Sequence, residues 1–110
     1  MGKFIKGDVV VVPFPFSDLS ASKRRPALVL VDLPGDDLIL CQITSQTISD
    51  EMAIPIDYTD FESGGLNLVS NARPNKLFTA DASIVLHKTG RLNAVKINEI
   101  MNTITKMFKD

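Results

Sequence analysis

The sequence predicts a mainly β domain that is closed by one C-terminal α-helix. Short β-branched and apolar runs, separated by turn residues, recur through residues 8–92, which is typical of a small antiparallel barrel. After residue 93 the apolar residues recur every three or four positions instead, which indicates an amphipathic helix. A chain of 110 residues has the length of one domain, so we expect residues 1–110 to form a single unit.

Long apolar runs make up the N-terminal part of the chain. Residues 8–16 (DVVVVPFPF) are rich in valine, and Pro13 and Pro15 lack the N–H that a strand donates, so we expect this run to end at a sheet edge or a bend. Residues 26–33 and 38–45 flank the turn sequence PGDD and predict an antiparallel hairpin. Both arms are apolar at consecutive positions, which indicates burial on two faces.

Shorter candidate strands follow in the middle of the chain. They are residues 53–58, where Pro55 favours a sheet edge, and residues 64–72, 76–81 and 87–92.

The C-terminal segment carries an apolar stripe at helical spacing. Its members are Val95, Ile97, Ile100, Met101, Ile104, Met107 and Phe108. Asn93 directly precedes the pattern and suits the N-cap position. We expect the stripe to be buried, either against the barrel or in a dimer contact.

Composition and charge narrow the class of function. Twelve basic residues against thirteen acidic ones give a net charge of −1, which argues against a general polyanion binder but leaves room for a small basic site. No apolar run reaches the roughly 18 residues that span a bilayer, and the N-terminus lacks a signal peptide's apolar segment, so we expect a cytoplasmic protein without a membrane anchor. The single cysteine, Cys41, lies in an apolar run and should behave as a buried small hydrophobe.

Familiar catalytic and cofactor motifs are missing from the sequence. His87 is the single histidine, so one chain cannot supply a histidine pair for acid–base chemistry. No Cys/His cluster has metal-ligand spacing, the glycines form no phosphate-binding motif, and the aspartates are scattered. We therefore expect neither a metal nor a cofactor.

Polar residues gather instead where the predicted strands begin and end. They are Lys23, Arg24 and Arg25, then Thr44, Ser45 and Gln46, and then Ser70, Asn71 and Arg73. Arginine presents a planar fork of donors that matches a phosphate group. If the hairpin register brings Thr44 close to Arg25, the pair would form an anion site able to stabilise a pentacoordinate phosphorane. The alternative is that Arg25 is a loop cation and that Thr44 simply ends a strand.

Four segments together resemble the MazF/PemK family of type II toxins. Residues 7–30 (GDVVVVPFPFSDLSASKRRPALVL) are similar to the family's opening, with its Gly-Asp, hydrophobic strand, polar loop and Arg-Pro. Residues 41–46 (CQITSQ) resemble the next strand and residues 68–81 (LVSNARPNKLFTAD) a later one. Residues 89–104 (TGRLNAVKINEIMNTI) resemble the lead into the C-terminal helix. The segments follow in the family's order over nearly the whole chain.

The resemblance implies a fold, an activity and partners. The fold is a small SH3-like, partly open antiparallel β-barrel with a C-terminal helix, assembled as a homodimer. The activity is metal-independent, sequence-specific cleavage of single-stranded RNA such as mRNA. In this reaction the substrate's own 2′-hydroxyl attacks, leaving a 2′,3′-cyclic phosphate and a 5′-hydroxyl end. A cognate antitoxin protein, with an acidic segment that folds onto the toxin beside its cations, is the implied protein partner.

The resemblance also assigns roles to particular residues. Arg25, directly before Pro26, matches the family's catalytic arginine, and Thr44 matches its catalytic threonine. The remaining RNA-binding candidates are Lys23, Arg24, Ser45, Gln46, Arg73, Asn75 and Lys76. Asn75 stands where some members carry an aspartate two positions after an arginine, so a carboxylate role does not carry over to that position.

Two alternatives to the nuclease remain open at this point. Related toxins of the CcdB type share the barrel but bind a protein target such as gyrase and cleave nothing. Their hydrophobic C-terminal end contrasts with MFKD here, and the Arg-Pro and Ile-Thr pairs favour the nuclease branch. A degenerate family member that binds RNA or its antitoxin without turnover is the other alternative.

Overall fold

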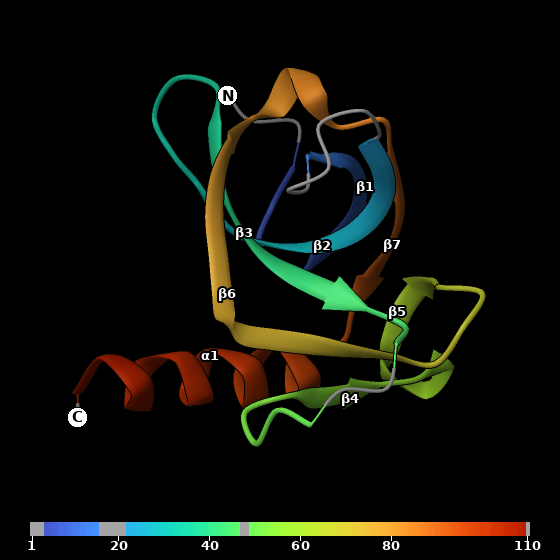
Figure 1. Ribbon diagram of the computed structural model, residues 1–110, viewed down its shortest axis with the longest axis vertical. Coiled ribbons are helices and arrows are strands. Elements are labelled where there is room, and N and C mark those ends of the chain that lie inside the picture. The colour runs from blue at the N-terminus through green and yellow to red at the C-terminus, as the bar shows by residue number, and fades with distance from the viewer. Residues whose placement is uncertain (1–3, 16–21, 47–48, 110) are drawn as a thin grey trace.

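A computed structural model describes residues 4–15, 22–46 and 49–109, and it describes only the backbone of residues 14, 15, 22 and 23. Within these ranges seven antiparallel strands form one sheet that curls into an open half-barrel, and a single α-helix packs across one end of it (Figure 1). The strands are β1 (Asp8–Pro15), β2 (Ser22–Asp32), β3 (Asp37–Thr44), β4 (Ile54–Ile56), β5 (Phe61–Gly64), β6 (Ser70–Asp81) and β7 (His87–Leu92). The helix α1 spans Ala94–Lys109, and short 3-10 helices span Tyr58–Asp60 and Ala82–Ile84.

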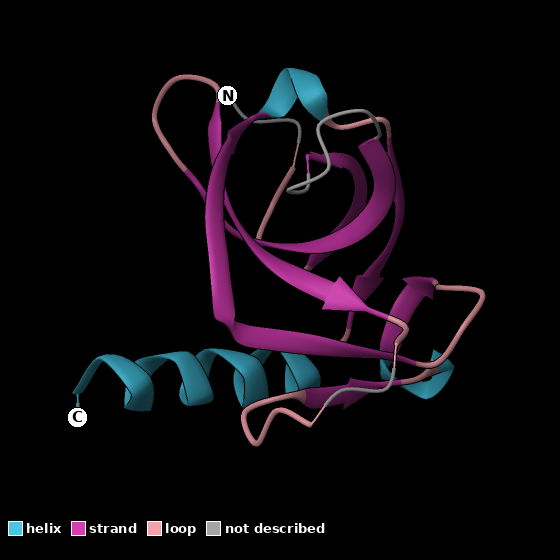
Figure 2. Cartoon of the chain, viewed as in Figure 1, coloured by secondary structure: helices cyan, strands magenta, loops and turns pink. Residues whose placement is uncertain are grey.

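The order of strands in the sheet is β4-β6-β3-β2-β1-β7-β5, so β4 and β5 are its two edges. Figure 2 shows how strongly the sheet curls, with strands on three sides of its interior. The predicted fold class, a mainly β barrel that is partly open and carries a C-terminal helix, is confirmed. The described part of the chain contains no helix that is long and apolar enough to cross a membrane.

The predicted central hairpin is formed by β2 and β3. Their register pairs Ala27 with Gln42 and Asp32 with Leu38, and Gly35 adopts the positive φ of +83° that the connecting turn requires. The predicted start of the first arm at residue 26 is wrong, because β2 already begins at Ser22. The extra residues pair with β1, in which Val12 lies opposite Arg25. Residues 23–25 are therefore part of a strand rather than of a loop that leads into one.

The proline-rich end of β1 has a sheet neighbour on one side only. β7 pairs with residues 8–11 of β1, whereas β2 continues to pair as far as Pro15. Pro13 and Pro15 therefore lie where no further strand needs their missing N–H groups. The expected sheet edge at this end of the run is confirmed, and Phe16, the last residue of the predicted run, lies outside the described residues.

The hairpin is buried on both faces, as its continuous apolar sequence predicts. One core, on the helix side of the sheet, contains Val9, Leu28, Leu30, Cys41, Ile43, Ile54, Ile56, Ala72, Leu92, Ile100 and Ile104. The other core, inside the curl, contains Val10, Val12, Ala27, Val29, Leu38 and Leu40. Alternate residues of the same strands enter the two cores, which is the period of two that a β-strand imposes.

The predictions for the middle of the chain are partly wrong. β4 is an edge strand around Pro55, as expected, and β7 matches the predicted residues 87–92. Residues 64–72 do not form one strand, since residues 65–69 lie outside any strand and β6 begins only at Ser70. Leu68 and Val69 are both 65% exposed, so the alternation that predicted a strand does not correspond to a buried face. Residues 76–81 are the second half of β6 rather than a separate strand.

A bulge bends β6 in its middle. Cys41 of β3 lies opposite Leu77, whereas its neighbour Gln42 lies opposite Arg73, so residues 74–76 drop out of the pairing. Such an insertion turns the strand locally, and the corner in β6 is plain in Figure 1. The bend aims the first half of β6 across the end of β3, where the polar residues of both strands meet.

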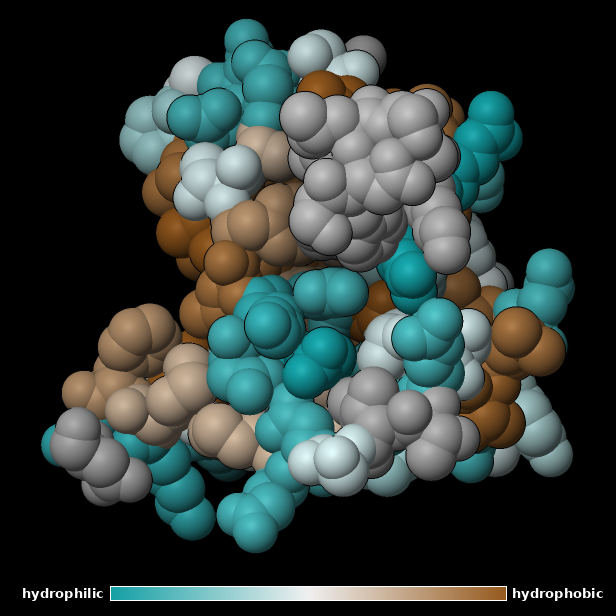
Figure 3. All heavy atoms as spheres, in the orientation of Figure 1, coloured by the Kyte–Doolittle hydropathy of each residue, from teal (hydrophilic) through white to brown (hydrophobic). Residues whose placement is uncertain are grey.

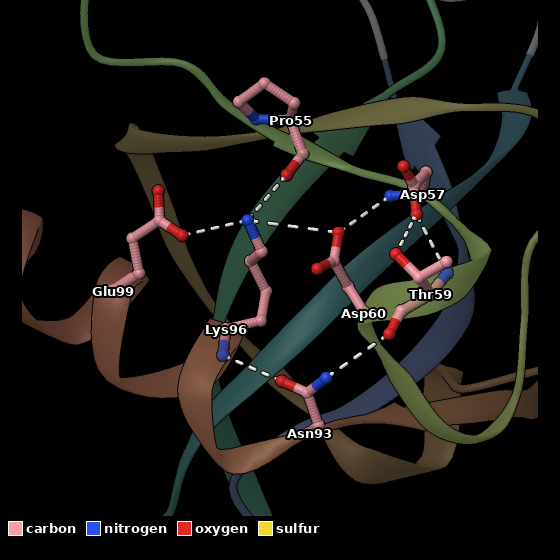
Figure 4. Close-up of polar contacts among 7 residues, drawn as sticks. All are labelled: Pro55, Asp57, Thr59, Asp60, Asn93, Lys96 and Glu99. Atoms are coloured by element: carbon pink, nitrogen blue, oxygen red, sulfur yellow. Dashed lines mark hydrogen bonds and ion pairs between the residues drawn. The ribbon is translucent and has the colours of Figure 1, made fainter.

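Helix α1 begins at the predicted cap. The Oδ1 atom of Asn93 accepts the N–H of Lys96 at 2.9 Å, and its Nδ2 atom donates to the Thr59 carbonyl at 3.4 Å. The Nζ atom of Lys96 donates to the Pro55 carbonyl at 3.0 Å and to Glu99 Oε1 at 2.8 Å. Figure 4 shows how this cluster joins the first turn of α1 to β4 and to the 3-10 helix that follows it.

The barrel buries only part of the helical apolar stripe. Ile100 and Ile104 are buried in the core on the helix side, and Ile97 and Met101 pack against the same core. Val95 and Phe108 are 78% and 74% exposed. The C-terminal half of α1 extends beyond the sheet in Figure 1, so the expectation that the whole stripe is buried does not hold within a single chain.

The Gly7-Asp8 pair of the sequence has a structural role. Gly7 has a φ of +98°, and a Cβ atom there would overlap the side chain of Ile97. Asp8 is buried, with its Oδ2 atom accepting the Ile5 N–H at 3.0 Å. Its Oδ1 atom accepts from Arg91 Nε at 2.9 Å and lies 3.2 Å from Lys88 Nζ. The pair therefore ties the N-terminal turn to β7 and packs it against α1.

Candidate nucleic-acid interface

The face inside the curl changes from apolar to polar along β3. Leu38 and Leu40 enter the inner core, whereas Cys41 and Ile43 enter the core on the helix side. By the same alternation, Gln42 and Thr44 continue the inner face toward the end of the strand. Polar side chains thus replace the apolar ones of the inner core in the last part of β3.

Arg25 belongs to the same face as Gln42 and Thr44. It alternates with Ala27 and Val29 of the inner core, and its partner across the sheet is Val12, also an inner-core residue. The side chain is half-buried, and its Nε atom is removed from solvent. The guanidinium group of Arg25 offers a planar fork of N–H donors on this face.

Strands β2 and β3 separate at the site. Ala27 and Gln42 form the last pair of their ladder, and Arg25 and Thr44 each lie two residues beyond it. Continuing the register would place Arg25 level with Thr44, and Figure 1 shows the start of β2 and the end of β3 diverging. Arg25 and Thr44 therefore lie on the same face of the sheet, on either side of the point where the two strands part.

Thr44 is held by the turn that follows it. It is only 3% exposed, and its Oγ1 atom accepts the backbone N–H of Gln46 at 3.2 Å. This bond uses a lone pair of the oxygen, so the hydroxyl hydrogen is still available to donate. A side-chain hydrogen bond of this kind is also consistent with a purely structural role for Thr44 at the end of β3. Ser45 and Gln46, which follow it, are exposed.

On β6 the polar face carries Asn71 and Arg73. Their partners across the ladder are Thr44 and Gln42, respectively. We use the term polar face for these five residues together: Arg25, Gln42, Thr44, Asn71 and Arg73. In Figure 3 hydrophilic side chains gather in the middle of the molecule, over the end of β3 and the bent part of β6.

An ion pair from outside the sheet orients Arg73. The Oδ2 atom of Asp50 lies 3.2 Å from Nη2 and 3.4 Å from Nε of Arg73. The Oδ1 atom of Asp50 accepts the N–H of Met52 at 2.9 Å. The pKa of Asp50 is lowered first by this backbone hydrogen bond and then by Arg73 and by a hydrogen bond from Asn75. Asp50 is therefore a charged carboxylate next to the polar face.

The other predicted site residues lie around this face rather than on it. Arg24 is exposed, and it alternates with Arg25 toward the opposite face of β2. Asn75 and Lys76 are exposed at the bend of β6. The side chain of Lys23 lies outside the described residues. Of the predicted set, the structure thus brings Arg25, Thr44 and Arg73 onto one face.

Two residues of the site did not emerge from the sequence. The sequence does set Gln42 apart, because it is a lone amide inside the otherwise apolar run LILCQI. The contact between Asp50 and Arg73 could not be predicted, because the two residues lie 23 positions apart in the sequence and Asp50 follows no recognisable motif.

The polar face gathers side chains that can donate hydrogen bonds. Two guanidinium groups, a hydroxyl and two amides can donate hydrogen bonds to phosphate oxygens. Cys41 lies behind this face, and burial raises the pKa of its thiol to about 12, so it is not poised as a nucleophile. Among the described residues, no group of three or more His, Cys, Asp or Glu side chains could hold a metal ion.

Comparison with known proteins identifies the family. The family model for the PemK-like, MazF-like toxin of type II toxin–antitoxin systems matches residues 5–108. The chain therefore belongs to this family, as its sequence segments indicated. Among curated proteins, no sequence matches it.

Solved structures share the fold at low sequence identity. A mycobacterial endoribonuclease in complex with its cognate antitoxin superposes with a TM-score of 0.75 at 12% identity, over 99% of this chain and 96% of that chain. The Mycobacterium tuberculosis toxin MazF-mt6 gives a TM-score of 0.72 at 18% identity, over 93% and 96%. A chain of a MazE–MazF crystal structure from Deinococcus radiodurans gives a TM-score of 0.75 at 16% identity, over 94% of each chain. At these identities the likeness establishes the fold.

Proposed function

We propose that this toxin is a metal-independent, sequence-specific endoribonuclease that cleaves single-stranded RNA at the polar face. The single observation that carries the proposal is the placement of Arg25 and Thr44. They come from neighbouring strands and share the inner face, each two residues beyond Ala27 and Gln42, the last pair before β2 and β3 part. Membership of the MazF-like toxin family, and the description of two similar folds as endoribonucleases, support the same reaction.

The reaction needs stabilisation of charge at phosphorus rather than a protein nucleophile. The substrate's 2′-oxygen forms a bond to phosphorus and loses its proton, and the bond from phosphorus to the 5′-oxygen breaks as that oxygen gains a proton. The products are a 2′,3′-cyclic phosphate and a 5′-hydroxyl end. Charge on the non-bridging oxygens grows in the transition state, where fixed donors stabilise it most strongly.

In this scheme Arg25 and Thr44 are the catalytic residues. Arg25 donates N–H groups to a non-bridging oxygen and supplies a positive charge beside it. Thr44 donates its hydroxyl hydrogen, while the bond from the Gln46 N–H fixes the position of its oxygen. Both donors are held by the sheet before substrate arrives, so little reorganisation is needed during the reaction.

The remaining predicted residues would bind the RNA on either side of the scissile phosphate. Arg73, held by Asp50, lies next to Gln42 on the polar face. Ser45, Gln46, Asn75 and Lys76 are exposed next to it. Contacts of this kind to the backbone position a strand without reading its sequence. Arg24 points to the opposite face of β2, so Arg24, together with its sequence neighbour Lys23, would attract the RNA by charge rather than contact it at the polar face.

The partners that we propose are single-stranded RNA and a cognate antitoxin. Two of the similar structures are described as a complex with a cognate antitoxin and as MazE–MazF. We further propose that residues 1–110 act as one domain within a cytoplasmic homodimer.

Cleavage of a long single-stranded RNA in excess EDTA tests the proposal. Purified wild-type protein is compared with Arg25→Ala and Thr44→Ala, and the chemistry of the product ends is determined. We expect discrete cuts that bear 2′,3′-cyclic phosphate, with rates reduced by about 10²–10³-fold in each variant, as for the loss of one oxyanion donor. Thr44→Ser, which keeps the hydroxyl, is the matched control and should retain more activity than Thr44→Ala.

Two results would contradict the proposal. Intact RNA after incubation with folded, antitoxin-free wild-type protein would favour a protein-binding toxin or an inactive RNA binder. Cleavage that stops in EDTA and returns with added Mg²⁺ would show that the reaction depends on a metal.

A further inference from the structure

Gln42 occupies the middle of the polar face. Its partners across the sheet are Ala27 on β2 and Arg73 on β6, so it lies between the strand that carries Arg25 and the strand that carries Asn71 and Arg73. Gln42 itself precedes Thr44 by two residues on β3, and the two side chains share a face. A residue in this position is adjacent to any RNA bound at Arg25 and Thr44.

The amide of Gln42 is available to a ligand. The side chain is half-buried, and within the described part of the chain it makes no hydrogen bond. Arg73, its neighbour, uses Nε and Nη2 for Asp50. Ala27, its neighbour on the other side, has only a methyl group. Among the described residues, the Gln42 amide is not one of the polar groups that are both buried and without a partner, so it is open to solvent and can exchange water for a ligand.

The chemistry of an amide differs from that of the other groups on this face. Guanidinium and hydroxyl donors suit phosphate oxygens, which only accept hydrogen bonds. A carboxamide holds a donor and an acceptor side by side in one plane, which is the arrangement on the edge of a nucleobase. Proteins that recognise single-stranded RNA by sequence read such edges on splayed bases.

We propose that Gln42 is a specificity-determining residue that reads one base beside the scissile phosphate. This inference rests on the proposed ribonuclease function and extends it to sequence recognition. The Gln42 carbonyl accepts from the base's exocyclic amine, and the Gln42 amino group donates to the adjacent ring nitrogen. Adenine and cytosine present that pair of groups, so the preferred base at this position is one of these two.

Mapping of cleavage sites in an RNA pool of random sequence tests the role of Gln42. Wild-type protein is compared with Gln42→Met, which keeps the length of the side chain but cannot form either hydrogen bond, and with Gln42→Glu. We expect Gln42→Met to lose the preference at one position of the motif and to cleave the best wild-type site about 10- to 100-fold more slowly, as for the loss of a bidentate base contact. A carboxylate accepts from both N–H groups on the guanine edge, so Gln42→Glu should shift that position toward guanine.

The controls distinguish a loss of base recognition from a loss of folded protein. Asn102→Ala removes an exposed amide from α1 and should leave both motif and rate unchanged. Thermal unfolding of each variant confirms that it is folded under the conditions of the assay. An unchanged motif in folded Gln42→Met, or a slower rate that is equal at every site, would overturn the proposal.

A binding assay keeps this test distinct from the test of cleavage. Short single-stranded RNAs that differ at one base are bound to Arg25→Ala and to the double variant Arg25→Ala/Gln42→Met. A base preference that is present in the first protein and absent from the second supports the role of Gln42 even if no cleavage is seen. Equal preferences, or no preference in either protein, would overturn it.

Discussion

Asp50 and Arg73 are joined by an ion pair in which one carboxylate oxygen accepts from both Nη2, at 3.2 Å, and Nε, at 3.4 Å. The pair links the segment that precedes β4 to the first half of β6, 23 residues further along the chain. It has two consequences for the polar face. It fixes the direction of the Arg73 guanidinium, and it offsets the positive charge that Arg73 would otherwise present to RNA.

The first prediction concerns this balance of charge. In Asp50→Asn, Arg73 loses its counter-charge and becomes available for one more phosphate contact. We expect tighter RNA binding at low salt, with the slope of log K against log salt steeper by about 0.7. The rate of cleavage at saturating RNA should fall, because Arg73 loses its fixed orientation. Fluorescence anisotropy at several salt concentrations and single-turnover rates measure the two effects.

Asp36→Asn is the matched control for this experiment, since it removes the same charge from the exposed turn between β2 and β3. Its salt slope should equal that of the wild type. An Asp50→Asn protein whose salt slope and cleavage rate both match those of the wild type would contradict the role given to the ion pair.

The second prediction concerns Asp8 and pH. Burial would raise the pKa of Asp8, but hydrogen bonds from Ile5, Arg91 and Lys88 outweigh it and lower the pKa. Because the native pKa lies below the unfolded one, the carboxylate stabilises the fold above the unfolded pKa and loses this effect as pH falls through the native pKa. Asp8→Asn should lower the free energy of unfolding by about 2 kcal/mol at pH 7. The difference in this free energy between wild type and Asp8→Asn should become smaller at acidic pH.

Urea unfolding of wild-type and Asp8→Asn proteins from pH 7 down to about pH 3 measures this difference. Asp32→Asn, at an exposed position on β2, is the control. Its free energy of unfolding should equal that of the wild type at each pH. A gap between wild type and Asp8→Asn that stays constant over the whole pH range would argue against the ionic role of Asp8.

The third prediction concerns the cap of α1. Asn93→Ala removes the acceptor for the Lys96 N–H and the donor to the Thr59 carbonyl. We expect a loss of about 1 kcal/mol in the free energy of unfolding. Asn93→Asp retains a capping oxygen and should lose less. If alanine and aspartate prove equally stable at position 93 in urea unfolding, the side chain does not act as a cap.

The fourth prediction concerns the thiol of Cys41. The side chain is buried, its Sγ atom lies 3.2 Å from the Arg73 carbonyl, and burial raises its pKa to about 12. Because the thiolate is the reactive form, a thiol reagent at pH 8 should modify the native protein far more slowly than the urea-unfolded protein. Labelling of both states over time checks this. Equal labelling rates would show that the thiol is accessible in the native fold.

Local features of the sequence were enough to predict several elements. The turn PGDD between two apolar runs predicts the β2–β3 hairpin, and the change of apolar period after Asn93 predicts α1 and its cap. These signals are reliable because turn chemistry and side-chain period act between residues that are close in the chain. Pro55 likewise indicates an edge strand, since a proline lacks the N–H that a central strand donates.

Other elements were decided by distant parts of the chain. β2 extends back to Ser22 because β1 supplies a partner for residues 22–25. Residues 65–69 form no strand despite their alternating pattern, because no core covers Leu68 and Val69. β6 is one long bent strand because β3 pairs with both of its halves across a bulge.

The sequence by itself determined which residues could serve an anion-binding site, and Arg25 and Thr44 were among them. Only the tertiary structure decided which of these residues share a face. Register and strand order put Arg25 and Thr44 on the same face and turn Arg24 to the opposite one, and they put Gln42 on the middle strand of the polar face. Folding also brings Asp50 to Arg73 across 23 residues. The physical reason is that the residue type fixes the hydrogen-bonding and charge properties of a side chain, whereas the pairing of distant strands fixes which other side chains lie next to it.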